Sequence, residues 1–479
     1  MMDTSLNIAR RSRELAELAD GRVVDVLVVG GGVTGVGAAL DAAARGLSVA
    51  LVEAQDLAFG TSRFSSKLVH GGLRYLANGD VALAYESAVE RGVLMSRVAP
   101  HLIRTLPQLV PLTDQTPARN AIITRAGLHA GDLLRRAART SGKLLPPPRR
   151  VSTAEALALA PGLRRDGLRG GLLSFDGQLV DDARLVVALA RTAAGHGARI
   201  LTRVRAEELD GNGARVRDVL AGHAFRLRAR SVLNATGVWA GELVDSVRLR
   251  PSRGSHLVLD GARHGLTGTA LTVPIPGSLN RFVLLLPQRD GRCYLGLTDE
   301  PLDGPIPDVP TVPESDVDFL LEVASSALAR PLTHADVIGR FAGLRPLVAS
   351  GSGKTADLSR RHAVVTGSNG VVTVVGGKLT TYRRMAEDAV DALGLNAGRS
   401  TTRHIRLVGQ STVDSEALLP GGTVTREDVL RAVRDEGALT VEDVLDRRTR
   451  LGLVDADREA ALSEVSALVA KCLAEFGGC

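Results

Sequence analysis

Hydrophobic residues near the N-terminus follow two different periods in succession. Residues 26–29 form an apolar, β-branched run, which is typical of a strand buried on both faces. Apolar residues at helical spacing then continue to about Arg45, and a second apolar run over residues 48–52 ends in Glu53. The pattern predicts a strand, a tight turn, a helix and a second strand.

Glycine spacing in the predicted turn indicates a dinucleotide site. Gly30, Gly32 and Gly35 fit the G-x-G-x-x-G pattern, which allows a tight turn, a close approach of a pyrophosphate and close helix–strand packing. The helix N-terminus favours the pyrophosphate charge, and Glu53 at the end of the next strand can accept ribose hydroxyls.

Three later segments also bring a predicted strand to a turn. Residues 181–209 read as a helix and a strand, so that Val204 can offer its backbone to an adenine edge. A strand from residue 229 ends at Thr236 and Gly237, and another ends at Gly376 before a helix. Each turn alone is compatible with an ordinary loop. Together with the first motif they favour a flavin dinucleotide, whose isoalloxazine charge the last helix N-terminus would stabilise.

The remaining sequence predicts additional domains. Residues 250–345 alternate short β-like runs with Pro and Gly turns, which indicates a mostly antiparallel sheet, and the chain beyond about residue 400 is charged and helical in period. The predicted fold is α/β, with a discontinuous Rossmann-type domain over residues 20–95, 168–240 and 345–395, a helical and basic insertion over 96–167, an antiparallel β-rich substrate domain over 241–344 and a short C-terminal helical domain over 400–479.

Composition and charge narrow the classes of partner. The chain has 479 residues, a net charge of +6 and 3% aromatic residues. The positive charge favours an anionic partner, whereas the few aromatics and the absence of a recognition motif argue against nucleic acid. The three cysteines show neither metal-ligand spacing nor a disulfide framework. Without a recognisable secretory signal or a membrane-spanning apolar run, we expect a cytoplasmic protein with no metal site.

Several ordered blocks resemble a known family. The block TSRFSSKLVHGGLRYL begins at Thr61, and NATGVW, RGSH, LTDE, GLRPL and GGKLTTYR follow it in order. These blocks resemble the FAD-dependent glycerol-3-phosphate dehydrogenases, within the glycine/D-amino-acid-oxidase-like flavoproteins. The resemblance covers roughly residues 20–395 and implies bound FAD.

The resemblance also implies which residues contact the cofactor. His70 and Gly71 would pass beside the isoalloxazine, where a glycine permits close approach, and Arg74 and Tyr75 would point into the substrate cavity. The other residues implied to bind FAD are Thr61, Ser62, Ser65, Ser66, Lys67, Leu68, Gly376, Lys378, Leu379 and Thr380. The relatives that bind FAD covalently through the last glycine turn use a cysteine there, whereas this chain has Gly377 and Lys378, so we expect a non-covalent flavin.

Cations in the matching blocks would hold a phosphate substrate. Arg345, Arg360 and Lys378 align with family positions that bind the phosphate or hydroxyls of a three-carbon substrate, although Arg361 could replace Arg360. Arg253 stands where relatives often have a lysine; an arginine cannot act as a base, so its role would be electrostatic. His70 is then the better proton acceptor, and an alternative for it is a structural histidine.

The implied reaction is oxidation of sn-glycerol 3-phosphate to dihydroxyacetone phosphate by hydride transfer to flavin N5, with catalytic roles for His70, Arg74 and Arg345. The electrons would pass to a membrane quinone; an oxidase that forms hydrogen peroxide and a non-catalytic flavin-binding protein are the alternatives. The basic residues 127–150, with Leu128, Leu133 and Leu134 near one helical face, are a candidate for peripheral contact with the cell membrane or a solvated loop. The sequence leaves open whether the chain forms a homo-oligomer.

Overall fold

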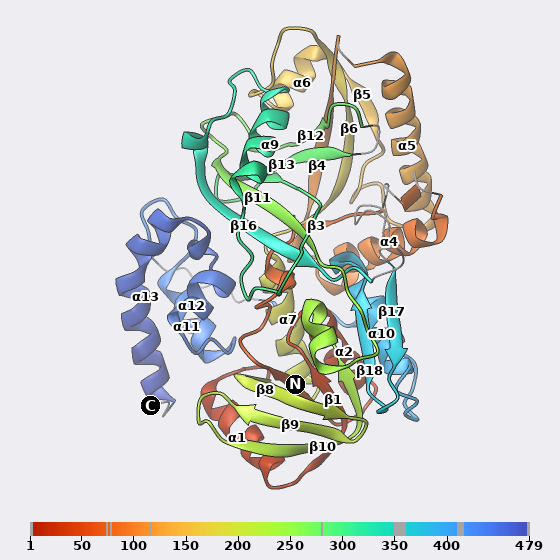
Figure 1. Ribbon diagram of the computed structural model, residues 1–479. Coiled ribbons are helices and arrows are strands. Elements are labelled where there is room, and N and C mark those ends of the chain that lie inside the picture. Colours follow the sequence, from red (N-terminus) through yellow and green to blue (C-terminus); the bar gives the residue numbers. More distant parts are fainter. Residues whose placement is uncertain are drawn as a thin grey trace.

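Two β-sheets and a C-terminal group of helices make up the molecule (Figure 1). The computed structural model describes residues 3–72, 75–76, 79–114, 116–278, 281–348, 361–409 and 416–476. Arg74 and Arg360 lie outside the described residues. None of the helices in these ranges combines the length and the apolar character needed to cross a membrane.

The first sheet has the order β17-β18-β10-β1-β2-β7 and contains the predicted dinucleotide-binding strands. Strands β10, β1, β2 and β7 run parallel, and β18 continues them, whereas β17 is antiparallel at the edge. The bounds are β1 Val23–Val29, β2 Val49–Glu53, β7 Arg199–Thr202, β8 Val204–Asp210, β9 Gly213–Asp218, β10 Ala224–Asn234, β17 His362–Thr366 and β18 Val372–Gly376.

Helices cover this sheet because its central strands are apolar on both sides. Val26, Leu27 and Val28 of β1 are fully buried, as the continuous apolar run predicts. Helix α2 contacts α7 and α10, and α1 contacts β7 and β10. The bounds are α1 Ile8–Ala19, α2 Val33–Ala44, α7 Asp182–Gly195, α8 Ala240–Leu243 and α10 Tyr382–Asp391.

The second sheet is larger than the predicted substrate domain. Its order is β15-β11-β14-β13-β12-β4-β6-β3, with β16 paired to β11 and β5 to β6. Pairing is antiparallel except between β12 and β4, which are parallel. The bounds are β3 Leu68–Val69, β4 Ile103–Thr113, β5 Arg149–Val151, β6 Leu168–Leu179, β11 Ser252–Asp260, β12 Ala270–Pro274, β13 Phe282–Pro287, β14 Arg292–Gly296, β15 Glu300–Pro301 and β16 Val337–Arg345.

Two strands of this sheet come from outside the range predicted for it. Strand β4 lies in the predicted helical insertion and β6 begins the predicted second part of the FAD domain, yet they pair along most of their length. Long-range pairing of this kind leaves no local signal in the sequence. The helices associated with this half are α4 Val81–Val93, α5 Ala118–Ala137, α6 Thr153–Leu159 and α9 Glu314–Ser325.

The C-terminal helices have a core of their own. Leu445, Val429 and Val465 are fully buried in a cluster that is confined to this part of the chain. Figure 1 shows the helices, in blue, beside the two sheets. The bounds are α11 Arg426–Arg434, α12 Val441–Asp443 and α13 Asp455–Glu475. We call residues 416–476 the C-terminal unit.

Candidate active site

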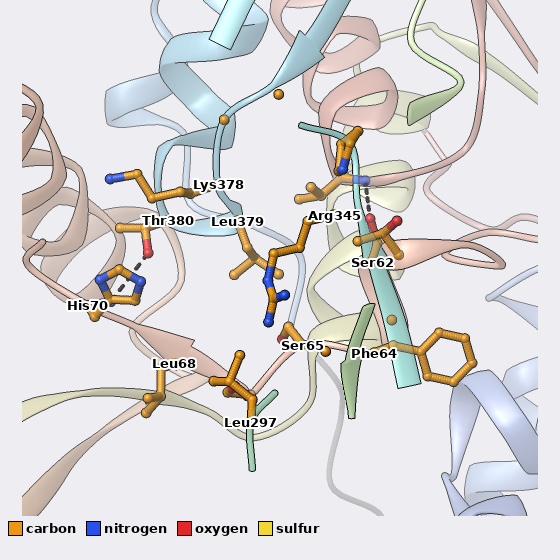
Figure 2. Close-up of a pocket in the computed structure, with 18 of the residues that line it drawn as sticks. Ser62, Phe64, Ser65, Leu68, His70, Leu297, Arg345, Lys378, Leu379 and Thr380 are labelled. Atoms are coloured by element: carbon orange, nitrogen blue, oxygen red, sulfur yellow. Dashed lines mark hydrogen bonds between the residues drawn. The ribbon is translucent and has the colours of Figure 1, made fainter. Parts of the chain in front are cut away.

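A cavity of about 1180 Å³ is lined by residues from both sheets. Its volume exceeds the range of about 300 to 1,000 Å³ that is common for small-molecule sites, so it has room for a dinucleotide and a small substrate. The structure brings the following predicted residues to its wall: Gly30, Gly32, Glu53, Thr61, Ser62, Ser65, Ser66, Leu68, His70, Gly71, Tyr75, Val204, Thr236, Gly237, Arg345, Gly376, Lys378, Leu379 and Thr380. Figure 2 shows part of this wall.

The glycine turn after β1 brings backbone N–H groups close to the cavity. Gly30 has a φ of 111°, and a Cβ there would lie 2.6 Å from the carbonyl oxygen of Ala235. Gly32 caps α2 and lines the cavity. Gly35 lies beneath the turn instead, where a Cβ would lie 2.0 Å from the oxygen of Gly30, so it serves helix–strand packing. This arrangement fits the pyrophosphate of FAD at the N-terminus of α2.

Glu53 is held at the end of β2 by two backbone donors. Its Oε2 accepts from Gly31 N at 2.6 Å and its Oε1 from Gln55 N at 2.8 Å. Burial raises the pKa of this carboxyl, and the two N–H groups act in the opposite direction. Arg203 N donates to Gln55 O at 2.9 Å, which brings Val204 of β8 close to Gln55, and both line the cavity. The geometry therefore suits an adenosine with its ribose near Glu53.

The polar segment after β2 follows the cavity through small side chains. Ser62 Oγ accepts from Val33 N at 2.9 Å, and Thr61 Oγ1 donates to Leu344 O at 2.6 Å. Figure 2 shows the Ser62 contact as a dashed line. Lys67 is placed differently: its side chain is 1% exposed and does not line the cavity, and its ammonium lies 2.8 Å from Asp182 Oδ1.

A second glycine turn, after β18, forms the opposite part of the wall. Gly376 and Gly377 have φ angles of 76° and 73°, a left-handed conformation that glycine adopts without strain. A Cβ on Gly377 would also lie 2.3 Å from Met385 Sδ. The turn leads through Lys378 into a short 3₁₀ helix, Leu379–Thr381. The residues of this turn line the cavity where the resemblance implies the flavin ring.

His70, Thr380 and Lys378 lie together at this end of the cavity (Figure 2). His70 N donates to Thr380 Oγ1 at 3.3 Å. Lys378 Nζ donates to Ser87 Oγ at 2.5 Å and lies 3.8 Å from the centre of the Tyr75 ring. A cation over an aromatic face is stabilised by the ring quadrupole. The segment containing His70 and the turn containing Lys378 are thus fixed against each other.

Arg345 ends β16 and points into the cavity (Figure 2). Its guanidinium donates to Asp299 Oδ1 at 3.1 Å and to Thr298 O at 3.1 Å. A Cβ on Gly254 would lie 2.3 Å from Nη2, so the missing side chain leaves room for the guanidinium. Asp299 therefore orients the guanidinium of Arg345 and does not bury it completely, since the Arg345 side chain keeps 20% of its surface exposed.

Arg253 is not part of the cavity wall, although it belongs to the RGSH block. Its Nε lies 3.2 Å from Asp316 Oδ2, on α9. Successive residues of a strand point to opposite faces, so Arg253 on β11 faces away while Gly254 lines the cavity. Arg253 is therefore ion-paired with Asp316 away from the residues that line the cavity.

His256 is one of several polar residues of the wall that sequence reasoning missed. His256 belongs to the same RGSH block, accepts or donates a hydrogen bond at 2.9 Å to Ser66 Oγ, and stacks on Phe341 with a centroid distance of 4.7 Å. Burial, together with the nearby Lys67 ammonium, lowers the pKa of His256 to about 3, so this imidazole is neutral at physiological pH. Its position two residues after Gly254 on one strand was the available signal.

Arg91 and Asp176 are two further wall residues that the sequence did not indicate. Their side chains form an ion pair of 2.7 Å, and both line the cavity. Burial raises the pKa of Asp176, and the Arg91 charge opposes that rise. A Cβ on Gly71 would lie 2.6 Å from Arg91 Nη1, so the glycine admits the guanidinium beside His70. Arg91 comes from α4 and Asp176 from β6, and no local pattern links them.

The first part of the basic segment, residues 127–137, belongs to helix α5, whose exposed face differs from the one predicted. Leu128 and Leu134 pack against buried clusters, and Arg135 is buried in an ion pair of 2.6 Å with Asp132. Leu133 is 64% exposed, and Ile122, one turn after the start of α5, is 68% exposed. The three leucines therefore do not share one exposed face, and Asp132 neutralises part of the predicted positive charge.

Comparisons with known proteins agree with this geometry. The profile described as FAD dependent oxidoreductase matches residues 25–383, and that described as C-terminal domain of alpha-glycerophosphate oxidase matches residues 362–474. The chain is 51% identical to glycerol-3-phosphate dehydrogenase 1 of Mycobacterium tuberculosis (strain ATCC 25618 / H37Rv) over 501 aligned residues, with 96% of this chain and 97% of that protein covered. It is 38% identical to glycerol-3-phosphate dehydrogenase of Mycobacterium leprae, with 94% and 85% covered.

Solved structures show the same fold. The glycerol-3-phosphate dehydrogenase from Bacillus halodurans, complexed with FAD, superimposes with a TM-score of 0.74 at 25% identity and covers 100% of this chain and 95% of its own. L-alpha-glycerophosphate oxidase from Mycoplasma pneumoniae, with FAD bound, gives a TM-score of 0.60 at 18% identity, which supports the fold alone. The turn from Gly30 to Gly32 and Glu53 together form what we call the dinucleotide cradle. The profile matches, the 51% identity over nearly the whole chain and this cradle show that the chain belongs to the family of FAD-dependent glycerol-3-phosphate dehydrogenases.

Proposed function

We propose that the chain oxidises sn-glycerol 3-phosphate to dihydroxyacetone phosphate and passes the electrons to a membrane quinone. One observation carries the substrate assignment: Arg345 and Lys378 line the same cavity as His70, and the dinucleotide cradle lines another part of its wall. Cations recognise the phosphate, and the alcohol carbon then lies toward the cofactor.

When bound, FAD would supply the acceptor for the hydride that leaves C2 of the substrate. The residues that would hold it non-covalently are the glycine turns at Gly30 and Gly376, the carboxylate of Glu53 and the polar segment from Thr61 to Leu68. The two cysteines in the described ranges are both buried, and Cys293 belongs to an apolar cluster of the second sheet.

The protein's own residues would bind, orient and deprotonate the substrate. Arg345 forms charged hydrogen bonds to phosphate oxygens, with Asp299 keeping its guanidinium in position. Lys378 adds a point charge, and Ser87 and Tyr75 orient it. The imidazole of His70 receives the C2 hydroxyl proton. His256 is a poorer acceptor because its pKa is far below neutrality.

The assignment of substrate can be tested with purified protein loaded with FAD. Anaerobic mixing with glycerol 3-phosphate is expected to bleach the flavin absorbance, whereas glycerol at the same concentration leaves it unchanged because it has no phosphate for Arg345. Bleaching by both compounds would contradict the role of the cations. No bleaching by either would remove the proposed activity and favour a flavin-binding protein without turnover.

The electron acceptor requires a separate measurement. A quinone acceptor calls for peripheral contact with a bilayer, and α5 supports it: Gly127 and Leu128 line the cavity, while Ile122 and Leu133 expose apolar surface beside the cations Arg125 and Arg136. The number of peroxide molecules formed per substrate oxidised in air separates the two candidates. A ratio near one indicates the oxidase, and a ratio near zero with rapid reduction of a quinone analogue indicates the dehydrogenase.

A further inference from the structure

The polar segment beside the cavity is built around a buried ammonium that does not touch the cavity. Phe64, Ser65, Ser66 and Leu68 all line the wall, but Lys67 between them is turned inward and has a left-handed backbone with a φ of 59°. A lysine is rarely buried completely unless it is paired.

Lys67 and Asp182 form the centre of the segment. The ammonium lies 2.8 Å from Asp182 Oδ1 and donates to the carbonyl of Arg63 at 3.1 Å. The other oxygen of Asp182 accepts from both the backbone N and the hydroxyl of Ser65, at 2.8 and 2.7 Å. Asp182 is the first residue of α7 and is fully buried. One carboxylate therefore holds both Ser65 and Lys67.

Arg450 and Asp446 of the C-terminal unit contact the same segment. Arg450 donates through Nη2 to the same carbonyl of Arg63, at 2.7 Å, and its Nε lies 3.2 Å from Asp181 Oδ2. Arg63 in turn lies 3.7 Å from Asp446 of the C-terminal unit. Three cations thus face three carboxylates, and one backbone carbonyl receives donors from two parts of the chain that are remote in sequence.

The opposite end of the segment reaches the substrate end of the cavity. Ser66 Oγ bonds to His256 Nε2 at 2.9 Å, and His256 stacks on Phe341 of β16, the strand that ends in Arg345. Lys67 Nζ also lies 5.1 Å from the centre of the Phe341 ring. A displacement at Lys67 would therefore reach both Ser65 and Ser66, which face the cofactor, and His256.

We propose that Lys67 is a positioning residue, and that the Lys67–Asp182 pair, closed by Arg450 of the C-terminal unit, sets the course of residues 64–68 along the FAD cavity. This inference goes beyond the proposed substrate and acceptor, because it concerns the shape of the cofactor wall. The C-terminal unit then contributes to cofactor binding without lining the cavity, since none of its described residues belongs to the wall.

The test compares Lys67→Met with Arg11→Met. Arg11 is a matched control because it is also buried and forms an ion pair, at 2.6 Å to Asp218. Arg11 and Asp218 neither line the cavity nor contact residues 64–68. Both substitutions are expected to lower the melting temperature of the apoprotein. Lys67→Met should raise the FAD dissociation constant by roughly tenfold or more, which corresponds to about 1.4 kcal/mol, and shift the visible flavin spectrum. Arg11→Met should change neither.

Arg450→Met extends the test if Lys67→Met does not fold. It should weaken FAD binding in the same direction by a smaller factor, and Arg450→Lys, which retains the charge, should recover part of the loss. Unchanged FAD affinity and spectrum in both Lys67→Met and Arg450→Met would overturn the proposal. Equal loss of FAD affinity in Arg11→Met would also overturn it, because the effect would then be general destabilisation. FAD binding is read directly, so the result is independent of which substrate the enzyme oxidises.

Discussion

Charged residues are organised differently at the cavity and at the contact with the C-terminal unit. At the contact, Asp56 binds Arg447 at 2.6 Å and Arg448 at 2.9 Å, and all three side chains are almost completely buried. At the cavity, Arg345 is braced from one side by Asp299 and retains exposed surface. Carboxylates surround Arg447 and Arg448 at the contact, whereas Arg345 faces a cavity that an anion can enter. The same residue type therefore holds the fold in one region and serves binding in the other.

This difference predicts separable effects of substitution. Changes in the cavity should alter chemistry or substrate binding with little change in stability. Changes at the contact should lower stability with little change in the chemical step, except where Lys67 and Arg450 connect the two regions. The following substitutions test this division.

His70→Ala is expected to give the largest effect. Loss of a general base typically slows a reaction by about 10² to 10⁴, and the rate should recover as pH rises if hydroxide can replace the imidazole. Stopped-flow measurement of flavin reduction at several substrate concentrations gives the limiting rate, and thermal unfolding gives the stability. A normal limiting rate would assign His70 a structural role. His70 would then resemble the residues at the contact with the C-terminal unit, which hold the fold and do not take part in the reaction.

Asp56→Ala should destabilise the protein by about 3 to 5 kcal/mol, because it removes the carboxylate that two buried guanidinium groups share: Arg448 loses this ion pair, and Arg447 keeps only its pairs within the C-terminal unit, with Asp443 and Asp446. Denaturant unfolding of the apoprotein measures the loss. The control is Glu464→Gln, which removes the partner of Arg426 from a pair that is largely solvated, and which should cost no more than about 1 kcal/mol. Equal effects of the two substitutions would show that burial does not distinguish these pairs.

The same contact should give the protein a characteristic acid sensitivity. Burial alone raises the pKa of Asp56, but Arg448 and Arg447 outweigh it, so the pKa lies below its ordinary value of 3.8. A depressed pKa contributes stability that is complete above the unfolded value and is lost as pH falls through the folded value. Unfolding free energy should therefore fall below about pH 4, and more steeply in the wild type than in Asp56→Asn. Parallel pH profiles would exclude Asp56 as a cause.

Arg345→Ala should reduce kcat/KM for glycerol 3-phosphate tenfold to a hundredfold, mainly through KM, with FAD still bound. Charged hydrogen bonds of about 1.5 to 3 kcal/mol give this range. Steady-state kinetics with a dye acceptor provides the value, and the flavin spectrum serves as the control for folding. If kcat/KM stayed within twofold of the wild type, the phosphate would have to bind elsewhere.

The smallest effect is expected on the exposed side of α5. Neutralising Arg125, Arg136 and Arg139 together should weaken sedimentation with anionic liposomes at low salt, since each cation contributes at most about 1 kcal/mol and salt screens it. Arg135 is left unchanged because its pair with Asp132 is internal. Reduction of flavin by substrate should be unaffected. Wild-type protein that stays in the supernatant at low ionic strength would remove the physical basis for a membrane quinone.

The sequence alone determined the dinucleotide cradle. The apolar run at residues 26–29, the glycines at 30, 32 and 35, and Glu53 specified a strand, turn, helix and strand, and β1, α2 and β2 confirm each element within a few residues. These features are local: a two-sided buried strand, a left-handed turn and a helical period each leave a recognisable pattern over a short stretch. The antiparallel strands between residues 250 and 345 were predictable for the same reason.

Only the tertiary structure decided how the other charges are used. From sequence, Lys67 and Arg253 resembled binding residues, while Asp182, His256 and Arg450 attracted no functional interpretation. Strand alternation turned Arg253 toward Asp316, and folding brought Asp182 and Arg450 from distant segments to the loop containing Lys67. Whether a cation is enclosed by carboxylates or faces a cavity depends on partners remote in sequence, because Coulomb interactions in a buried site are set by spatial separation and local dielectric.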